Sequence, residues 1–279
     1  MKTYLDALQF VLENGKERPD RTSTGTIGVF GMQQRYDLSQ GFPAVTTKQL
    51  AFKSCLSELL WFIEGSNDER RLAEILHGTR DASKRTIWTD NASAPYWTNR
   101  ALREFEGDLG RIYGVQWRDF GGVDQLLELV KNLKRDPYGR RHIISAWNPA
   151  EIDKMALPPC HCFAQFYVSA DGKLSCQMYQ RSCDMFLGVP FNIASYSILT
   201  HMIAQVCGCE VGEFIHVLGD AHIYTNHVEQ VKEQLSRKPL ALPTLWINPD
   251  VKDITQFTMD DFRLEGYTCH PPIKAPMAV

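Results

Sequence analysis

Apolar residues recur along the chain with the spacing of helix faces. Leu5, Leu8 and Leu12 share one face of a helix predicted over residues 3–13. Three further segments predict helices, and two of these are so apolar that we expect them to be buried. The apolar helices are predicted over residues 50–64 and 193–207, and the amphipathic one over residues 122–134.

Other segments carry the pattern of strands. Two apolar runs, residues 162–169 and 173–180, flank an Ala-Asp-Gly turn and predict a β-hairpin. The remaining extended segments are residues 142–147 and residues 24–38, the latter with bends at Gly25 and Gly31.

The 279 residues contain no Ser/Gly linker, no break in composition and no internal repeat. Residues 66–108 are polar and are predicted to be the least regular part, and the Pro-rich tail from Gly266 is expected to be irregular. We therefore predict one α+β domain over residues 1–279, with a mixed or antiparallel sheet packed against two buried helices.

Composition narrows the class of protein. Hydrophobic residues make up 44% of the chain, which is enough for a core, and the net charge is −3. Binding to nucleic acid or to an acidic membrane surface needs a dense basic face, so neither is expected. No apolar run approaches membrane-spanning length, and residues 1–4 open into an amphipathic pattern, so we expect a cytoplasmic protein.

The eight cysteines are scattered and form no C-x-x-C pair, which argues against a disulfide framework and a structural zinc site. No metal is therefore expected. The common nucleotide-binding and hydrolase signatures, such as G-x-G-x-x-G and G-x-S-x-G, are also absent from the sequence.

Cys160 is a candidate nucleophile because Pro158 and Pro159 stiffen the backbone before it, at the mouth of the predicted hairpin. A reactive thiol needs partial exposure and a positive environment, whereas a lone cysteine is more often a packed core residue. Arg181, at the end of the hairpin, would suit a thiolate or a phosphate, and its alternative is an ion pair with Asp184.

The sequence leaves two possible roles open for each of three other arginines and one carboxylate. Arg21, Arg140 and Arg141 lie in predicted loops, where they either bind phosphate oxygens or are simply solvated. Glu58 lies inside the apolar helix over residues 50–64. Its side chain either points outward, which is the commoner case, or is buried with a raised pKa and relays protons.

Taken together, ordered blocks along almost the whole chain resemble the thymidylate synthase family. The first six blocks are residues 20–22, 42–48, 58–62, 112–118, 140–141 and 145–148. The remaining five are residues 159–161, 180–188, 190–196, 219–224 and 271–274.

The resemblance implies alkylation at C5 of dUMP, with 5,10-methylene-tetrahydrofolate as the carbon donor. Cys160, paired with His161, would add to C6 of the uracil ring and make C5 nucleophilic. Tyr113 and Glu58, through ordered water, would handle the C5 proton and O4. Asn192 would read the base edge, because a carboxamide accepts from uracil N3–H and donates to O4. Cytosine presents the reverse pattern, and the related deoxycytidylate hydroxymethylases carry Asp there.

The resemblance also implies a homodimer that uses one face of the sheet. The expected phosphate ligands are Arg21, Arg181 and Ser182, together with Arg140 and Arg141 donated across the interface. His222 and Tyr224 would hold the sugar hydroxyl, and Asp184 would touch both substrate and folate. The expected folate contacts are Lys48, Ile87, Trp88, Asp184, Leu187, Gly188, Phe191 and Ala278, the last in a C-terminal segment that closes over the site.

Several positions depart from the family pattern. Thr89 stands where Asp is usual, Asn91 where cellular members carry Trp, and Leu218 where Gly is common. Gln49 and Ala51 replace basic residues that in many relatives touch the folate tail. Residues 50–51 and 117–122 look like those of bacteriophage members, which suggests a protein of a bacterial cell or its phage.

Two reactions share every residue up to an exocyclic methylene intermediate. Hydride transfer from tetrahydrofolate gives a methyl group, whereas addition of water gives a hydroxymethyl group, as in phage deoxyuridylate hydroxymethylases. We favour methylation, because the Cys160–His161 pair, Trp88 and the Ala278-Val279 end are intact. A third possibility, an inactive relative that only binds, would be marked by loss of Cys160 or Arg181, and both are present.

Overall fold

The computed structural model describes residues 1–20 and 24–276, and its larger sheet has six strands. The strand order is β1-β2-β6-β5-β4-β3. β5 and β6 run parallel, and the other neighbouring pairs are antiparallel, so the predicted mixed sheet is confirmed. The strands are β1 (Lys16–Arg18), β2 (Thr26–Asp37), β3 (Ile143–Ser145), β4 (His161–Val168), β5 (Lys173–Asp184) and β6 (Glu210–Tyr224).

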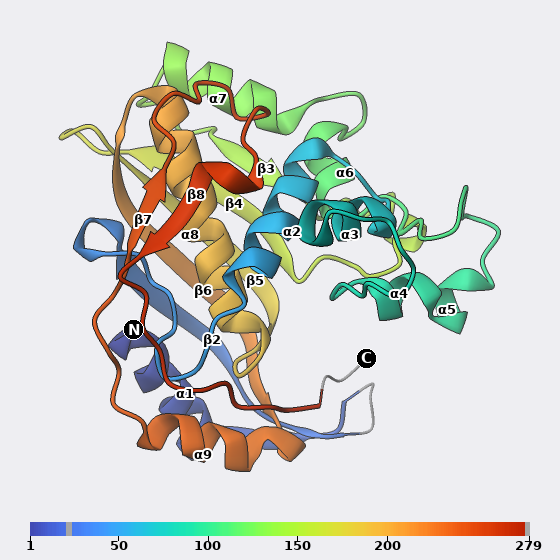
Figure 1. Cartoon of the computed structure of the whole chain (residues 1–279), viewed down its shortest axis with the longest axis vertical. Coiled ribbons are helices and arrows are strands. Elements are labelled where there is room, and N and C mark those ends of the chain that lie inside the picture. The colour runs from blue at the N-terminus through green and yellow to red at the C-terminus, as the bar shows by residue number, and fades with distance from the viewer. Residues whose placement is uncertain (21–23, 277–279) are drawn as a thin grey trace.

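Helices and a small ribbon complete the α+β fold, which Figure 1 shows from the side of the helices. The ribbon consists of the antiparallel strands β7 (Thr244–Ile247) and β8 (Phe262–Glu265). The longer helices are α1 (Lys2–Asn14), α2 (Phe52–Glu64), α3 (Glu69–His77), α7 (Gln125–Arg135), α8 (Gly188–Cys207) and α9 (Val228–Ser236). The shorter ones are α4 (Thr89–Ser93), α5 (Pro95–Thr98) and α6 (Tyr113–Arg118).

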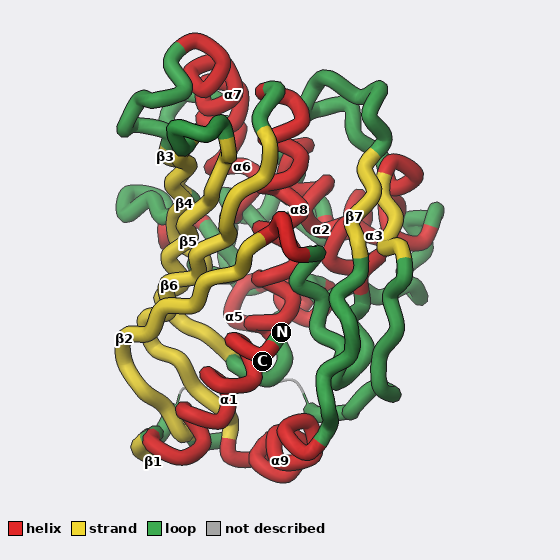
Figure 2. The backbone as a smooth tube through the Cα atoms, turned by 90° about the vertical axis from the view of Figure 1, so that its left-hand side faces the viewer, coloured by secondary structure: helices red, strands yellow, loops and turns green. Residues whose placement is uncertain are grey.

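The sheet has one covered face and one open face. In Figure 2 the strands of this sheet run down the left-hand side of the molecule, and α8 and α2 lie to their right, toward the middle. The core forms between these layers, because α8 is apolar on all sides and most of its residues are buried. On the open face, Phe163 and Tyr167 of β4 and Ile143 of β3 are exposed apolar side chains.

The predicted helices over residues 3–13, 50–64, 122–134 and 193–207 correspond to α1, α2, α7 and α8. α8 begins at Gly188, ahead of the predicted start, because Pro190 falls in its first turn, where no intrahelical N–H is needed. The predicted hairpin is β4–β5, and its second strand continues to Asp184.

Two expectations need correction. Residues 66–108 are more regular than predicted, because the Asp68 side chain caps the start of α3 by accepting a hydrogen bond from the Arg70 amide, and Gly78 ends the helix with φ +73°. The long strand β6 was not predicted, although its first half alternates between buried and half-buried positions. It lies between β2 and β5 and is central to the sheet.

Candidate active site

A cavity of about 310 Å³ opens where the end of β5, the start of α8 and the middle of α2 meet. Most of the residues that the sequence singled out line it, although they are far apart along the chain. These are Glu58, Ile87, Trp88, Tyr113, Cys160, His161, Ser182, Asp184, Leu187, Gly188, Phe191, Asn192, His222 and Tyr224.

Cys160 lies immediately before β4, half-buried, with its side chain on the cavity wall. Arg181 of the neighbouring strand β5 holds the loop that carries it: Nε donates to the Pro159 carbonyl at 2.8 Å and Nη2 to the Pro158 carbonyl at 2.9 Å. The same Nη2 is 4.0 Å from Cys160 Sγ. The sulfur is therefore accessible from the cavity and has a positive charge beside it.

Two opposing effects act on the Cys160 thiol. Burial raises its pKa, and the nearby Arg181 guanidinium and the Tyr113 hydroxyl lower it. Burial is the larger effect, so the thiol form is favoured in the free protein. A further positive charge or a positioned proton acceptor would be needed to form the thiolate.

Tyr113 and His161 make a rigid wall beside this sulfur. The Tyr113 hydroxyl accepts a hydrogen bond of 2.7 Å from the Cys160 amide, and its ring stacks on His161 with centroids 4.0 Å apart. His161 Nδ1 lies 2.8 Å from the Tyr196 hydroxyl, and burial lowers the pKa of His161 to about 3. His161 is therefore a neutral imidazole near neutral pH.

Glu58 points inward from α2 rather than outward, and only 6% of the residue is exposed. Its Oε1 accepts a hydrogen bond of 2.6 Å from the indole Nε1 of Trp88. Burial raises the pKa of Glu58 to about 7, and the Trp88 bond opposes that rise. Glu58 can therefore hold or release a proton near neutral pH.

The close approach of α6 to α2 depends on Gly114. A Cβ at this position would lie 2.6 Å from the Phe62 carbonyl oxygen and 2.7 Å from Phe62 Cα. Glycine therefore allows the two helices to touch and brings Tyr113 to the same cavity as Glu58.

The opposite wall is polar and comes from β5, α8 and β6. Ser182, Asn192, His222 and Tyr224 all line it. His222 Nδ1 lies 3.1 Å from the Asp220 carbonyl oxygen, which fixes the ring. The Asn192 carboxamide makes no hydrogen bond to any described residue, so its donor and acceptor are available to a molecule in the cavity.

Apolar side chains and one carboxylate form the remaining wall. Ile87 and Phe191 line the cavity, as does Leu187 at the start of α8. Asp184 shapes this turn, because its Oδ1 accepts hydrogen bonds from the backbone amides of Phe186 and Leu187, at 3.0 and 3.1 Å. A flat ring system with one polar edge would fit between these apolar groups and Asp184.

Some predicted site residues do not line the cavity. Lys48 is buried, its Nζ donates to the Phe186 carbonyl and lies 3.6 Å from the centroid of the Phe186 ring, and burial lowers its pKa to about 8. Arg140 and Arg141 are exposed on the loop after α7. Arg21 and Ala278 lie outside the described residues.

Three cavity residues had no role predicted for them: Asn91, Leu157 and Gln180. Gln180 is held by His216, whose Nε2 lies 2.8 Å from Gln180 Oε1, and its own amide donates to the Ser182 carbonyl. Gln180 adjoins Arg181 in sequence, which is the signal that could have identified it.

The positions that depart from the family pattern fall in different environments. Asn91 lines the cavity, whereas Leu218 is fully buried in β6 and does not. Gln49 and Ala51 are exposed beside the start of α2. The Thr89 hydroxyl donates a hydrogen bond to the buried carboxylate of Glu69.

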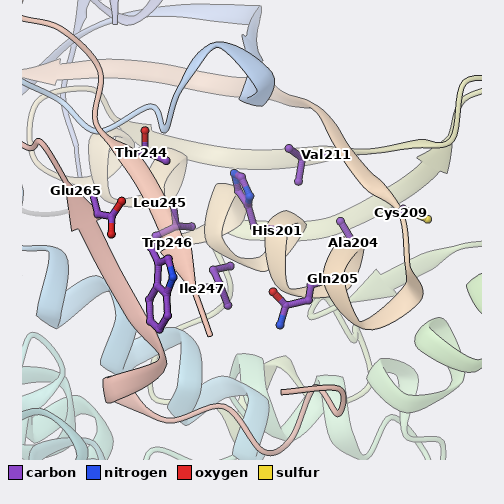
Figure 3. A pocket seen from close by; sticks show the side chains of 10 residues that line it. All are labelled: His201, Ala204, Gln205, Cys209, Val211, Thr244, Leu245, Trp246, Ile247 and Glu265. Atoms are coloured by element: carbon purple, nitrogen blue, oxygen red, sulfur yellow. The ribbon is translucent and has the colours of Figure 1, made fainter. Parts of the chain in front are cut away.

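A second cavity, of about 360 Å³, lies between α8 and the β7–β8 ribbon, and Figure 3 shows its lining. Gln205 on this wall already donates to the Asn248 and Val251 carbonyls. Burial lowers the pKa of His201 to about 4. None of the predicted site residues lies here, so the cavity around Cys160 is the candidate active site.

Within residues 1–20 and 24–276, no cluster of three or more His, Cys, Asp or Glu side chains could hold a metal ion. No helix in this part of the chain is long and apolar enough to cross a membrane.

A family model described as thymidylate synthase matches residues 2–279. The match covers essentially the whole chain, and the mixed sheet with its covering helices agrees with the fold that the resemblance implied. The chain therefore belongs to the thymidylate synthase family.

Proposed function

We propose that this protein transfers a one-carbon unit from 5,10-methylene-tetrahydrofolate to C5 of dUMP and releases dTMP and dihydrofolate. The observation that carries the proposal is the half-buried Cys160 sulfur in a cavity that also holds the buried Glu58 carboxyl and the Asn192 carboxamide, which has no hydrogen-bond partner among the described residues. The family match supports the same chemistry.

The proposed reaction begins with addition of the Cys160 thiolate to C6 of the uracil ring, which places the electron pair of the C5–C6 double bond on C5 and O4. C5 then bonds to the methylene carbon of the folate and loses its proton. Departure of tetrahydrofolate leaves an exocyclic methylene, which takes a hydride from the folate. The thiolate leaves as the C5–C6 double bond is restored.

Glu58 and Tyr113 suit the proton transfers of this sequence. Glu58, with a pKa of about 7, can deliver a proton toward O4 and take it back through water. The Tyr113 hydroxyl lies beside the sulfur, 2.7 Å from the Cys160 amide nitrogen. Neutral His161 stacks on Tyr113 and keeps it in place.

Asn192 would select uracil over cytosine. Its free carboxamide accepts from N3–H and donates to O4, whereas cytosine has an acceptor at N3 and a donor at C4. Ser182, which lines the cavity, and Arg181, whose Nη2 lies 4.0 Å from Cys160 Sγ, would bind the phosphate, and the family resemblance adds Arg21 as a further ligand. His222 and Tyr224 would bind the sugar hydroxyl. Asp184 would contact both ligands. Trp88, Ile87, Leu187, Gly188 and Phe191 would pack on the folate. The family resemblance alone adds Ala278 as a further folate contact.

The phosphate site would be completed by a second subunit. Arg140 and Arg141 are exposed, lie outside the cavity of their own chain and make no ion pair with any described residue. The open sheet face presents Phe163, Tyr167 and Ile143 to solvent, as a dimer interface would. We therefore propose a homodimer of single-domain subunits, in which each subunit contributes Arg140 and Arg141 to the phosphate site of the other.

A second candidate activity is hydroxymethylation of dUMP. Asn91 lines the cavity where cellular relatives carry Trp, and its amide donates to the Tyr96 hydroxyl on the solvent side. A polar side chain on this wall can hold water near the exocyclic methylene. Water would then add to the methylene carbon in place of hydride and lose a proton, and the Cys160 thiolate would leave as the C5–C6 double bond is restored. Tetrahydrofolate would be released unoxidised.

One assay separates these activities. Purified protein is incubated with dUMP and methylene-tetrahydrofolate. The molecular mass of the nucleotide product is measured by mass spectrometry, and formation of dihydrofolate is followed by absorbance. Methylation requires thymidylate and an equal amount of dihydrofolate. Hydroxymethyl-dUMP without dihydrofolate would favour the second candidate, and unchanged dUMP would exclude both.

A further inference from the structure

Glu69 is a buried carboxylate outside the candidate cavity that binds three side chains. It is the first residue of α3, and only 2% of it is exposed. Its Oε1 accepts hydrogen bonds from the hydroxyls of Thr86 and Thr89, at 2.6 and 2.7 Å. Arg70 holds the same carboxylate through Nε and Nη2, at 2.6 and 2.7 Å. This set of donors makes a buried negative charge tolerable.

The hydroxyl oxygens of Thr86 and Thr89 also accept hydrogen bonds from backbone amides within the turn over residues 86–89. The Thr86 amide donates to Thr89 Oγ1 at 2.8 Å, and the Trp88 amide donates to Thr86 Oγ1 at 3.2 Å. Each hydroxyl therefore accepts from the backbone of the turn and donates to Glu69. The conformation of the turn depends on the carboxylate to which both hydroxyls point.

Trp88 lies within this turn, and its indole reaches the cavity. The indole Nε1 donates to Glu58 Oε1 at 2.6 Å, and the ring meets Tyr113 edge-on with centroids 6.0 Å apart. Because the indole is rigid beyond its two side-chain torsions, the backbone of the turn sets where its N–H points. A chain of direct contacts thus joins Glu69 to Glu58.

We infer that Glu69 is a positioning residue for Glu58: by holding the 86–89 turn through Thr86 and Thr89, it keeps the Trp88 indole N–H on the Glu58 carboxylate. The role of Glu58 as proton carrier belongs to the proposed function, on which the catalytic part of this inference rests. The contact chain itself can be tested without any turnover.

The ionisation of Glu58 is the natural readout, because a donor on a carboxylate favours its charged form. Trp88 is its hydrogen-bond partner. The other titratable groups around it are Cys55 on the same helix, Tyr113 on α6, Tyr196 on α8, and Cys160 and His161 in the cavity. None of these is altered in the variants below.

The experiment follows the ¹⁵N-labelled Trp88 indole N–H signal of the free, full-length protein by NMR between pH 5 and 9. Trp88→Phe assigns the signal, and Glu58→Gln removes its titration. Glu69→Gln and Thr89→Val test the inference, the latter keeping the shape of threonine without its hydroxyl. Glu74→Gln is the matched control, because Glu74 is on the same helix but pairs with Arg71 and Arg80.

We expect the titration midpoint to rise by about one unit in Glu69→Gln and Thr89→Val, and to stay at the parent value in Glu74→Gln. An unchanged midpoint in either folded test variant would overturn the inference, and Thr89→Val decides the matter if Glu69→Gln does not fold. The product assay on the parent protein reports on the proposed function separately. If the midpoint shifts but the parent protein lacks the activity, the positioning role of Glu69 is supported and the proposed function is rejected.

Turnover adds a second readout if the activity is present. Both test variants should lower kcat by about tenfold with little change in the KM for dUMP, because Glu58 serves the chemical steps and not nucleotide binding. Equal losses in all variants, Glu74→Gln included, would indicate a general loss of stability and contradict the inference.

Discussion

Arg181 Nη2 lies 4.0 Å from Cys160 Sγ while the same guanidinium binds the carbonyls of Pro158 and Pro159. One side chain therefore fixes the loop that carries the sulfur and places positive charge beside it. In the free protein, burial still outweighs this charge and raises the pKa of the Cys160 thiol. Activation of the sulfur should accordingly depend on what enters the cavity.

Replacement of the sulfur should abolish the chemistry and spare the fold. We expect Cys160→Ala to lower turnover of dUMP by about four orders of magnitude or more, because no other group could form the bond to C6. The variant should bind dUMP with nearly unchanged affinity in calorimetry. Cys269→Ala, at a half-buried cysteine outside the cavity, is the matched control and should retain activity. Near-normal turnover by Cys160→Ala would remove the covalent route.

Base selection should follow the carboxamide at position 192. The parent protein is expected to prefer dUMP over dCMP, and Asn192→Asp should move the ratio of their kcat/KM values toward dCMP by about 100-fold or more. Paired steady-state assays with both nucleotides measure this ratio. Asn132→Asp, on α7, controls for the added charge. Equal use of the two nucleotides by the parent would contradict the role of Asn192.

A shared phosphate site should allow two inactive chains to restore each other. Arg141→Glu is expected to be inactive because it removes a phosphate ligand of the partner's site, and Cys160→Ala lacks the nucleophile. Mixed dimers would contain one intact site and should recover up to about a quarter of the parent activity, given random mixing. Arg135→Glu, an exposed change on α7, should be active alone. Absence of recovery after proven subunit exchange would contradict the shared site.

Burial of Glu58 should appear in the pH dependence of stability. Its pKa is raised from 4.5 to about 7, so between these values the folded state keeps a proton that the unfolded chain has lost. Stability should therefore fall as pH rises through this window, by about 3 kcal/mol for this group. Glu58→Gln should remove that slope in urea unfolding at pH 5 to 8. Parallel pH profiles of parent and variant would show that Glu58 titrates normally.

Much of the architecture could be predicted from local patterns. α2 and α8 follow from long apolar stretches, and the β4–β5 hairpin follows from its turn. β6 is not predictable from its own sequence, because charged residues and Leu218-Gly219-Asp220 interrupt its alternation of apolar and polar positions. No local turn signals its parallel pairing with β5.

The site was predictable as a set of residues and less so as a geometry. The sequence pattern of a carboxylate within an apolar helix is the same whether the side chain points inward or outward. The burial of Glu58, its place in the cavity wall and its hydrogen bond from Trp88 show that it points inward. Lys48 stays a predicted folate contact, and in the free protein its ammonium contacts the carbonyl and the ring of Phe186. Contacts between segments distant in sequence decide both cases.

The bond between Cys160 and the pyrimidine ring is the central claim, and it can be measured directly. The protein is mixed with methylene-tetrahydrofolate and 5-fluoro-dUMP, whose C5 fluorine cannot leave as a cation and so stalls the reaction after the bond has formed. Intact mass and peptide mapping should show one adduct per chain containing both ligands, on the peptide that carries Cys160, and none in Cys160→Ala. An unmodified chain, or an adduct on another residue, would contradict the account.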